Sequence, residues 1–342
     1  MGRILLVLGA GASYDCANES SVVNGDWKPP LASELFRISE KDAFEDILIQ
    51  YPGAQYLAGE LSPSSSENEF DLERKLQDLV GHQDKSIRDK FGDVPRYLSH
   101  LLDTVSTEYT KTAGWYCALC KALMSDHGHR LSVISLNYDT LFESAVALHF
   151  NNPRYYSDIK AFARQGMECQ LFKVHGSSNW WFDVGRGAAM RDTFHSTFQD
   201  HCDDWVNRIL VLSRSQLQGM HQIDATRLVP VITAPLASKG EGSFVIPGYQ
   251  VSALMDSIQD ADAVMFVGTS GMDSHVLDFI RGSLQRAVPG CFIGHGTGAE
   301  PARSRVAKAM GDSLSSLELH DCGFGEALRQ RRVHTFAAGV RR

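Results

Sequence analysis

Asn137, Asp139 and His175 are the side chains of this sequence best placed for chemistry, because each lies where an apolar run ends. His175 stands before Gly176-Ser177-Ser178. An imidazole titrates near neutral pH and can serve as a general base. Asn137 is suited to hold a hydroxyl group or a water molecule. In a purely structural alternative Asp139 or Thr140 caps the following helix, which explains Asp139 well but explains Asn137 less well, because one cap residue is enough.

Two glycine-containing turns also follow apolar runs. One is Gly9-Ala10-Gly11-Ala12-Ser13 and the other is Gly268-Thr269-Ser270-Gly271. Glycines allow the backbone to approach a phosphate group closely, so that N–H groups can bind it. A plain glycine-rich turn fits the first segment equally well. Tyr14 stands where the fingerprint G-x-G-x-x-G needs its last glycine, which disfavours a hydride-transfer dehydrogenase of the common type.

These residues need a scaffold that brings their strand ends together. Nearly continuous apolar runs predict buried strands at Ile4–Leu8, Leu131–Leu136, Leu171–Val174, Ile209–Leu212, Val229–Ile232 and Ala263–Val267. Helical spacing lies between several of them. The pattern predicts an α/β fold, a Rossmann-like open parallel sheet with helices on both faces. Ligands of such sheets bind at the carboxyl ends of the strands, so the four polar strand ends are expected to form one site.

Residues 15–129 show helical spacing without a convincing strand, for example at Phe44, Ile47 and Leu48. We predict a helical insert there, between the first and second strands of a single domain that spans residues 1–342. The stretch Phe182–Asp204 is polar and mixed, which indicates an irregular loop or lid. Trp180 and Trp181 could line a pocket for a flat ring, but core or lid aromatics are the favoured interpretation.

A metal site is not expected. His195, His201, Cys202, Asp203 and Asp204 lie close together in the sequence, but their spacing matches no ligand pattern. The seven scattered cysteines are typical of reduced thiols in a cytosol. Cys117 and Cys120 form a lone C-x-x-C within a helical run, where buried small hydrophobic side chains are the better interpretation.

Composition limits the partners of the protein. The net charge of −8 is unsuited to nonspecific nucleic-acid binding. The apolar run Ile4–Leu8 is short and is better explained as a buried strand than as a signal peptide, and we expect no segment that spans a bilayer. A cytoplasmic protein that binds neither nucleic acid nor membrane is therefore expected. The basic C-terminal end, from Arg329 to Arg342, is interpreted as a solvated end, with a docking patch for an acidic partner as the alternative.

The ordered set of motifs resembles the sirtuin superfamily, over about residues 3 to 330. It is most similar to the bacterial sirtuin-like domains of antiphage defence, where Leu-Asn-Tyr-Asp and Val-His-Gly-Ser are familiar forms, present here as Leu136–Asp139 and Val174–Ser177. Pro30-Leu31 and Phe70-Asp71-Leu72-Glu73 also resemble segments of that group.

The resemblance implies a Rossmann-like NAD site, with no metal. It assigns the pyrophosphate to Gly9, Ala10, Gly11 and Ser13, and phosphate or ribose to Gly268, Thr269 and Ser270. It makes Asn137 and His175 the catalytic pair and places Asp139 near the nicotinamide amide. The sequence lacks the two C-x-x-C pairs and the Gly-Ile-Pro-Asp-Phe-Arg loop of the deacylating sirtuins, which argues against binding of acyl-lysine peptides.

The resemblance further implies an NAD glycohydrolase that releases nicotinamide and ADP-ribose, acting as a regulated toxic effector in antiphage defence. Its control would come from a homo-oligomer or from a partner such as an ATPase or an Argonaute-like protein. Three alternatives remain open. One is a non-catalytic assembly subunit that binds NAD or ADP-ribose, and another is an NAD-dependent protein deacylase or ADP-ribosyltransferase. The third is an unrelated Rossmann-like enzyme that has similar turns. The preference between NAD and NADP also stays open.

Overall fold

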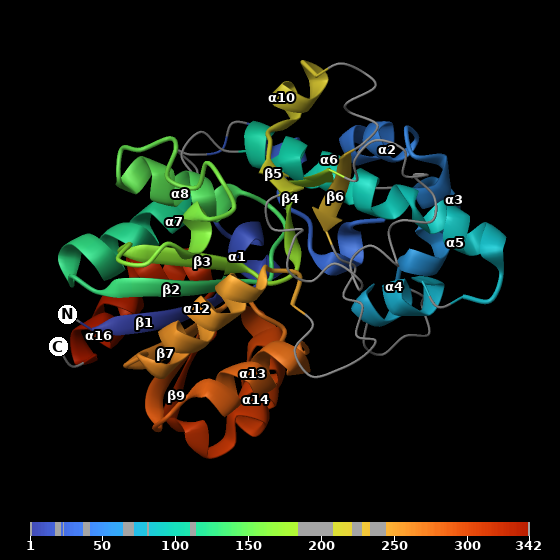
Figure 1. Cartoon of the computed structure of the whole chain (residues 1–342). Coiled ribbons are helices and arrows are strands. Elements are labelled where there is room, and N and C mark those ends of the chain that lie inside the picture. Colours follow the sequence, from blue (N-terminus) through green and yellow to red (C-terminus); the bar gives the residue numbers. More distant parts are fainter. Residues whose placement is uncertain are drawn as a thin grey trace.

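A six-stranded parallel sheet forms the centre of the molecule in the computed structural model, as Figure 1 shows. The structure describes residues 2–17, 22, 24–36, 42–63, 72–80, 82–109, 114–183, 208–220, 228–232 and 244–340. Across the sheet the strands are β3 (Cys169–Lys173), β2 (Arg130–Ser135), β1 (Arg3–Leu8), β7 (Ala263–Val267), β8 (Val288–Ile293) and β9 (Leu314–His320). From β1 the chain proceeds outward to β2 and β3 on one side, whereas β7, β8 and β9 follow on the other. The order therefore reverses between β1 and β7, which is where ligands bind in sheets of this kind.

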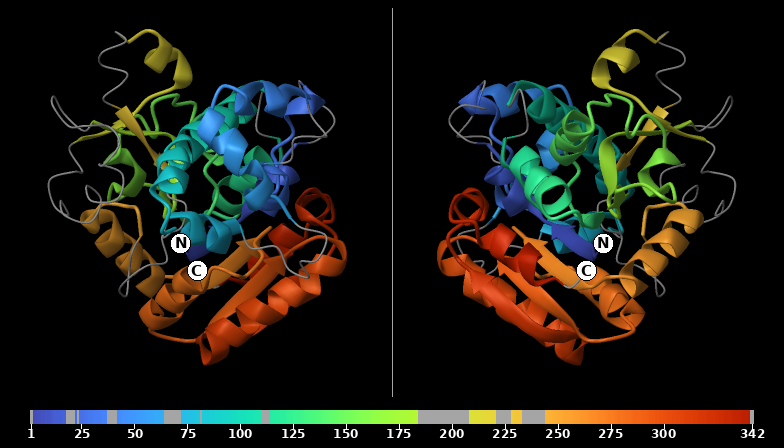
Figure 2. Two further views of the ribbon diagram at one scale, coloured as in Figure 1. Left: turned by 90° about the vertical axis from the view of Figure 1, so that its right-hand side faces the viewer. Right: turned by 90° about the vertical axis from the view of Figure 1, so that its left-hand side faces the viewer.

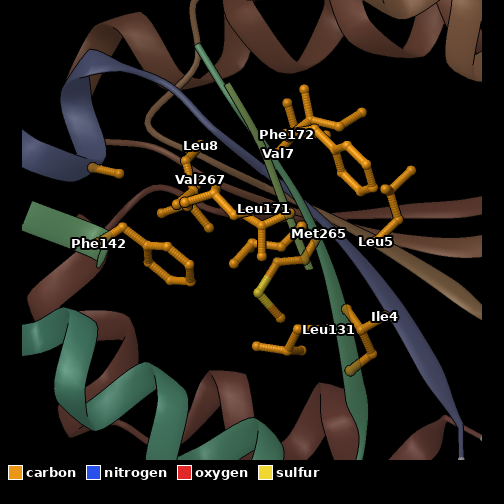
Figure 3. Packing of buried hydrophobic residues seen from close by; sticks show 14 of the residues in the cluster. Ile4, Leu5, Val7, Leu8, Leu131, Phe142, Leu171, Phe172, Met265 and Val267 are labelled. Carbon is orange, nitrogen blue, oxygen red and sulfur yellow. The ribbon is translucent and has the colours of Figure 1, made fainter. Parts of the chain in front are cut away.

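The central strands are apolar because both of their faces are covered. All residues of β3 and β7 are buried, and in β1 and β2 only the first residue is not. Figure 3 shows Leu5, Val7 and Phe172 on one side of the strands, and Ile4, Leu131 and Met265 on the other. Successive side chains of a strand point to opposite faces, so a strand buried on both sides reads as a continuous apolar run. The predicted α/β parallel sheet is confirmed.

The helices lie between and after the strands in the sequence. Between β1 and β2 lie α1 (Ala10–Tyr14), α2 (Asp42–Leu48), α3 (Pro52–Leu61), α4 (Leu72–Val80), α5 (Lys85–Phe91), α6 (Asp93–Glu108), α7 (Gly114–Cys120) and the π-helix η3 (Lys121–Asp126). Later come α8 (Leu141–His149), α10 (Arg214–Gln218), α12 (Gly248–Gln259), α13 (Ser274–Ser283), α14 (Ala299–Met310), α15 (Phe324–Arg329) and α16 (Arg332–Gly339). Short 3₁₀ turns are η1 (Gly25–Trp27), η2 (Ala32–Glu34), η4 (Ala161–Ala163), η6 (Gly296–Gly298) and η7 (Gly311–Ser313).

The helices α2 to α6 form the insert expected after the first strand. They share a hydrophobic core of their own, which includes Phe36, Leu57 and Leu101. Figures 1 and 2 show these blue and cyan helices apart from the orange α13 and α14. Within the described residues the chain between β1 and β2 contains no strand element.

A second, three-stranded sheet corrects two of the predicted strands. The runs at Ile209–Leu212 and Val229–Ile232 do form strands, β5 (Ile209–Val211) and β6 (Leu228–Ile232), but both pair antiparallel with β4 (Gly176–Asp183) outside the parallel sheet. The residues of β6 are all buried, and β6 packs against α6. An apolar run indicates that both faces of a strand are buried, but it does not indicate which sheet the strand joins.

Three strands were missed in the sequence. Phe182 and Asp183, predicted to begin a loop, instead end β4, and residues 184–207 lie outside the described part of the chain. Pro289 and Gly290 interrupt the apolar pattern of β8, and the edge strand β9 is largely exposed. Edge strands need no continuous apolar run because neither face is fully covered. The described helices include none long and apolar enough to cross a membrane.

Candidate active site

The register of the parallel sheet brings four strand ends to one level. Leu8, the last residue of β1, pairs with Ser135 of β2 and with Val267 of β7. Ser135 in turn pairs with Lys173 at the end of β3. The polar segments that follow these strands therefore start side by side, at the edge where the strand order reverses.

The two glycine turns pack backbone against backbone. The N–H groups of Gly9 and Gly11 donate to the carbonyl oxygens of Val267 and Gly268, both at 2.9 Å. A Cβ atom on Gly9 would lie 2.6 Å from the Gly268 oxygen, and one on Gly268, whose φ is +63°, would overlap the backbone nitrogen of Ala12. The close approach of the turns therefore requires glycine here. These N–H groups already have partners in the sheet, so the predicted pyrophosphate contact stays a prediction.

Asn137 is held by the first glycine turn. Its Nδ2 donates to the Gly9 carbonyl oxygen and to the Ser13 hydroxyl, both at 3.0 Å. A carbonyl oxygen can only accept, so the amide nitrogen must face Gly9 and Oδ1 must face the other way. Asn137 Oδ1 is buried without a hydrogen-bond partner among the described residues. An unpaired buried acceptor costs about 1–3 kcal/mol, so this atom is suited to receive a hydrogen bond from a bound molecule.

Ser13 joins Asn137 to Asp139. Its hydroxyl accepts from Asn137, donates to Asp139 Oδ2 at 2.7 Å and lies 2.9 Å from the Tyr116 hydroxyl. Burial, followed by the charge of Asp139, raises the pKa of Tyr116 well above its ordinary value, so the phenol keeps its proton and donates to Ser13. The Ser13 hydroxyl is buried within this network, which holds Asn137 in place. Nothing in the sequence pattern had singled out Tyr116.

Asp139 serves two purposes. Its Oδ1 accepts the backbone N–H of Leu141, the first residue of α8, at 3.1 Å, whereas the N-cap position itself is Thr140, whose side chain makes no capping bond. Its Oδ2 belongs to the Ser13 network instead. The structural explanation of Asp139 is thus correct for one oxygen, and the other helps to orient Asn137.

Lys173 and Glu143 form a buried ion pair beneath this turn. Lys173 Nζ donates to Glu143 Oε1 at 2.7 Å and to the backbone carbonyl of Asp139. The Lys173 side chain has no exposed surface and that of Glu143 is only 9% exposed. Burial raises the pKa of Glu143, although the Lys173 ammonium opposes the rise. No sequence motif indicates this pair, and its only signal is a lysine within the apolar run Leu171–Val174.

His175 lies between β3 and β4 and pairs with an aspartate from another strand end. His175 Nε2 lies 2.5 Å from Asp273 Oδ2, and the two side chains are 12% and 10% exposed. The neighbouring Gly176 has φ of +86°, and a Cβ there would overlap the Val231 carbonyl oxygen. The chain can therefore turn from β3 into β4 at this point only with glycine.

Contacts link the segments that follow β1, β2, β3 and β7 to one another. The β7 turn contacts the β1 turn, the β1 turn holds Asn137, and the ring of Tyr138 lies 6.4 Å from that of His175 between centroids. His175 pairs with Asp273, which follows the β7 turn. The structure thus brings Asn137, His175 and both glycine turns together at the carboxyl ends of the strands.

The side chains of the other predicted site residues make contacts within the protein. Thr269 Oγ1 accepts the N–H of Gly271 at 3.2 Å, and Ser270 Oγ accepts that of Met272 at 3.3 Å, so both hydroxyls close the β7 turn. Trp180 is a core residue, with its ring 5.1 Å from that of Phe162 between centroids. The run from His195 to Asp204 lies outside the described residues. Elsewhere in the described chain no three His, Cys, Asp or Glu side chains are grouped so that they could hold a metal ion.

Comparison with solved structures finds Sir2 proteins. A mutant Sir2 homologue in complex with 2′-O-acetyl ADP ribose is 12% identical, with 98% of this chain and 93% of that chain covered and a TM-score of 0.46. A Sir2 homologue in complex with NAD is also 12% identical, with 98% and 90% covered and a TM-score of 0.42. None of the curated proteins compared with the chain matches it.

Comparison with family models gives a match in the central part of the chain. The matched stretch runs from the first buried residue of β2 through β7 and α13 to the beginning of β8. It carries Asn137, His175, Gly268 and Asp273, but not the β1 turn. Residues 131–289 match the model of the SIR2-like domain family.

Proposed function

We propose that this protein binds NAD at the carboxyl ends of β1 and β7 and hydrolyses the bond between nicotinamide and ribose. The observation that carries the proposal is the buried Oδ1 of Asn137, which has no hydrogen-bond partner within the described part of the chain. The β1 turn holds Asn137 at the same sheet edge as the His175–Asp273 pair. The match of residues 131–289 to the SIR2-like domain family supports NAD as the substrate.

The bond to nicotinamide is already activated, because the ring is cationic in NAD and leaves as a neutral molecule. The protein has to hold the ribose, stabilise the positive charge that develops on it, and supply water. Asn137 Oδ1 would accept a hydrogen bond from the attacking water or from a ribose hydroxyl and so orient it. His175 would accept the proton that this water or hydroxyl loses. The products would be nicotinamide and ADP-ribose.

The rest of the nucleotide would lie along the two glycine turns. These turns follow β1 and β7, the two strands between which the strand order reverses. The proposed contacts are Gly9, Ala10, Gly11 and Ser13 in the first turn, and Gly268, Thr269 and Ser270 in the second. Phosphate or ribose binding there is part of the proposal, and so is a place for the nicotinamide amide near Asp139. Thr269 is buried whereas Ser270 is exposed, so Ser270 is the hydroxyl more open to a ligand.

The test is to incubate the purified protein with NAD and to quantify free nicotinamide and ADP-ribose. We expect equal amounts of both products, and loss of most of the activity in Asn137→Ala and His175→Ala without unfolding. Asn152→Ala and His82→Ala, at exposed positions, are the matched controls and should behave as the parent does. Variants of Asn137 and His175 with near-parent turnover would refute the assignment. Release that depends on an acetylated peptide would indicate a deacylase instead, and binding without turnover in every assembly state would indicate an assembly subunit.

An enzyme that removes NAD would harm the cell that makes it, so its activity has to be held off until needed. We propose that assembly provides this control, either with further copies of the chain or with a partner protein, as in a defence system. Measurement of the size and activity of the same fractions tests the idea. Activity that appears only in an assembly would support it, and a fully active lone monomer would contradict it.

A further inference from the structure

We propose that Asp273 is a positioning residue for His175, which holds the imidazole in one tautomer and orientation and stabilises the charge that the ring acquires. The role presupposes the function proposed above, in which His175 accepts a proton. The observation behind it is that the two carboxylate oxygens have different partners. Oδ1 accepts the N–H of Val276 at 3.1 Å, and Oδ2 lies 2.5 Å from His175 Nε2.

A backbone hydrogen bond holds the Asp273 carboxylate independently of its contact with His175. Its bond to Val276 fixes it to the first turn of α13, a helix of ten residues. The loop that leads to it is held as well, because the Ser270 carbonyl accepts from Arg305 Nε at 2.9 Å. A side chain whose own orientation is set by backbone contacts can fix the orientation of a second one.

The charge of the carboxylate determines the tautomer. Burial alone would raise the pKa of Asp273, but the hydrogen bond and charge of His175, with the N–H of Val276 and the charge of His275, lower it below its ordinary value. Asp273 is therefore ionised at neutral pH and can only accept hydrogen bonds. The neutral imidazole must then carry its hydrogen on Nε2, and a proton from the substrate would go to Nδ1.

A helix cap explains only half of these contacts. The cap uses Oδ1, and any good capping residue would supply it, whereas Oδ2 and its contact with His175 serve no helix. Asp273→Ser separates the two functions. A serine hydroxyl caps a helix well, but its side chain is too short to reach His175 at the same time. Asp273→Asn is the second variant, since it keeps the size and the capping oxygen and removes the charge.

Asp84→Ser is the matched control. Asp84 caps α5 in the same way, by accepting the N–H of Ser86 at 2.8 Å, at an exposed position far from His175 in the sequence. We expect kcat for nicotinamide release to fall about 100-fold in Asp273→Ser, which is the usual range for a general base, while KM for NAD changes little. Asp84→Ser should retain the parent kcat. Equal kcat values in the parent and Asp273→Ser would overturn the proposal.

A double-mutant cycle shows whether Asp273 acts through His175. In a His175→Ala background, Asp273→Ser should cause no further loss, because the ring that it positions is absent. The same fold-loss in both backgrounds would mean that Asp273 acts elsewhere, and the proposal would be wrong.

The tautomer can be observed without any activity, by ¹⁵N NMR of the imidazole, with His175→Gln used to identify the signal. We expect a hydrogen on Nε2 in the parent and a mixture of tautomers in Asp273→Ser. An unchanged spectrum would overturn the proposal. A parent protein that releases no nicotinamide in any assembly state would refute the proposed function instead, and the spectrum would still decide whether Asp273 sets the tautomer of His175.

Discussion

A methyl group added at Gly9 should separate the two glycine turns and disturb Asn137. Gly9 has an extended backbone, with φ of −112° and ψ of 177°, which alanine adopts without strain. Its Cβ, however, would lie 2.6 Å from both the Gly268 oxygen and the Thr269 Cα, whereas real Cβ atoms essentially never approach to under 3.0 Å. The turns would therefore have to move apart by about 0.4 Å or more, at a cost of about 1–3 kcal/mol for overpacking.

Gly248→Ala is the matched comparison, because a Cβ at Gly248 meets nothing within 4 Å. Alanine restricts the unfolded chain in both variants, which stabilises the folded state by about 0.4–1 kcal/mol. We therefore expect Gly248→Ala to be slightly more stable than the parent, and Gly9→Ala to be less stable by about 1–2 kcal/mol. The free energy of unfolding from denaturant titration measures both values.

The same change should reduce the proposed activity. The Gly9 carbonyl oxygen accepts from Asn137 Nδ2 at 3.0 Å, so a shift of the turn moves the side chain proposed to orient water. A displacement of 1 Å costs about 100-fold in rate, so roughly tenfold slower nicotinamide release is expected for Gly9→Ala. If Gly9→Ala were as stable as Gly248→Ala and as active as the parent, the account of the turn packing would be refuted.

Two further predictions concern buried charges. Lys173→Met should destabilise the fold by about 3–5 kcal/mol, because it leaves Glu143 buried without its partner, and Lys173→Met/Glu143→Met should recover much of this loss. Burial, followed by the charge of Arg214, lowers the pKa of His100 from 6.5 to about 4. The unfolded chain then binds the additional proton, so the free energy of unfolding should fall by about 3 kcal/mol as the pH drops from above 6.5 to below 4. Denaturant titrations across this range test the second prediction.

Each of these predictions has a result that contradicts it. If the double variant were no more stable than Lys173→Met, the destabilisation would not come from an unpaired buried carboxyl group. For the histidine, His100→Gln supplies the control, since it removes the titrating group and should flatten the pH dependence between 6.5 and 4. If the free energy of unfolding of His100→Gln depended on pH as steeply as that of the parent, the proton taken up on unfolding would belong to another residue.

Four of the six strands of the main sheet, and the polar residues that follow them, were predictable from the sequence. The strands at Ile4–Leu8 and Ala263–Val267 were predictable because a strand covered on both faces consists almost entirely of apolar residues. In a parallel sheet the segments after such strands must emerge at the same edge, so Asn137, His175 and the glycine turns could be placed together without knowledge of any contact. The bond from the Leu141 N–H to Asp139 Oδ1 was predictable because it joins residues only two apart in the chain.

Strand pairing and the contacts between buried polar groups depend on the whole fold and could not be predicted from the sequence. The apolar run of β6 satisfied the sequence criteria for the parallel sheet, yet it pairs with β4, because burial alone does not specify a neighbouring strand. The partners Tyr116 for Ser13, Lys173 for Glu143 and Asp273 for His175 are equally absent from the sequence pattern. Each of these contacts joins residues far apart in the chain, so no local spacing encodes it, and it forms only when the sheet sets the distance between its strands.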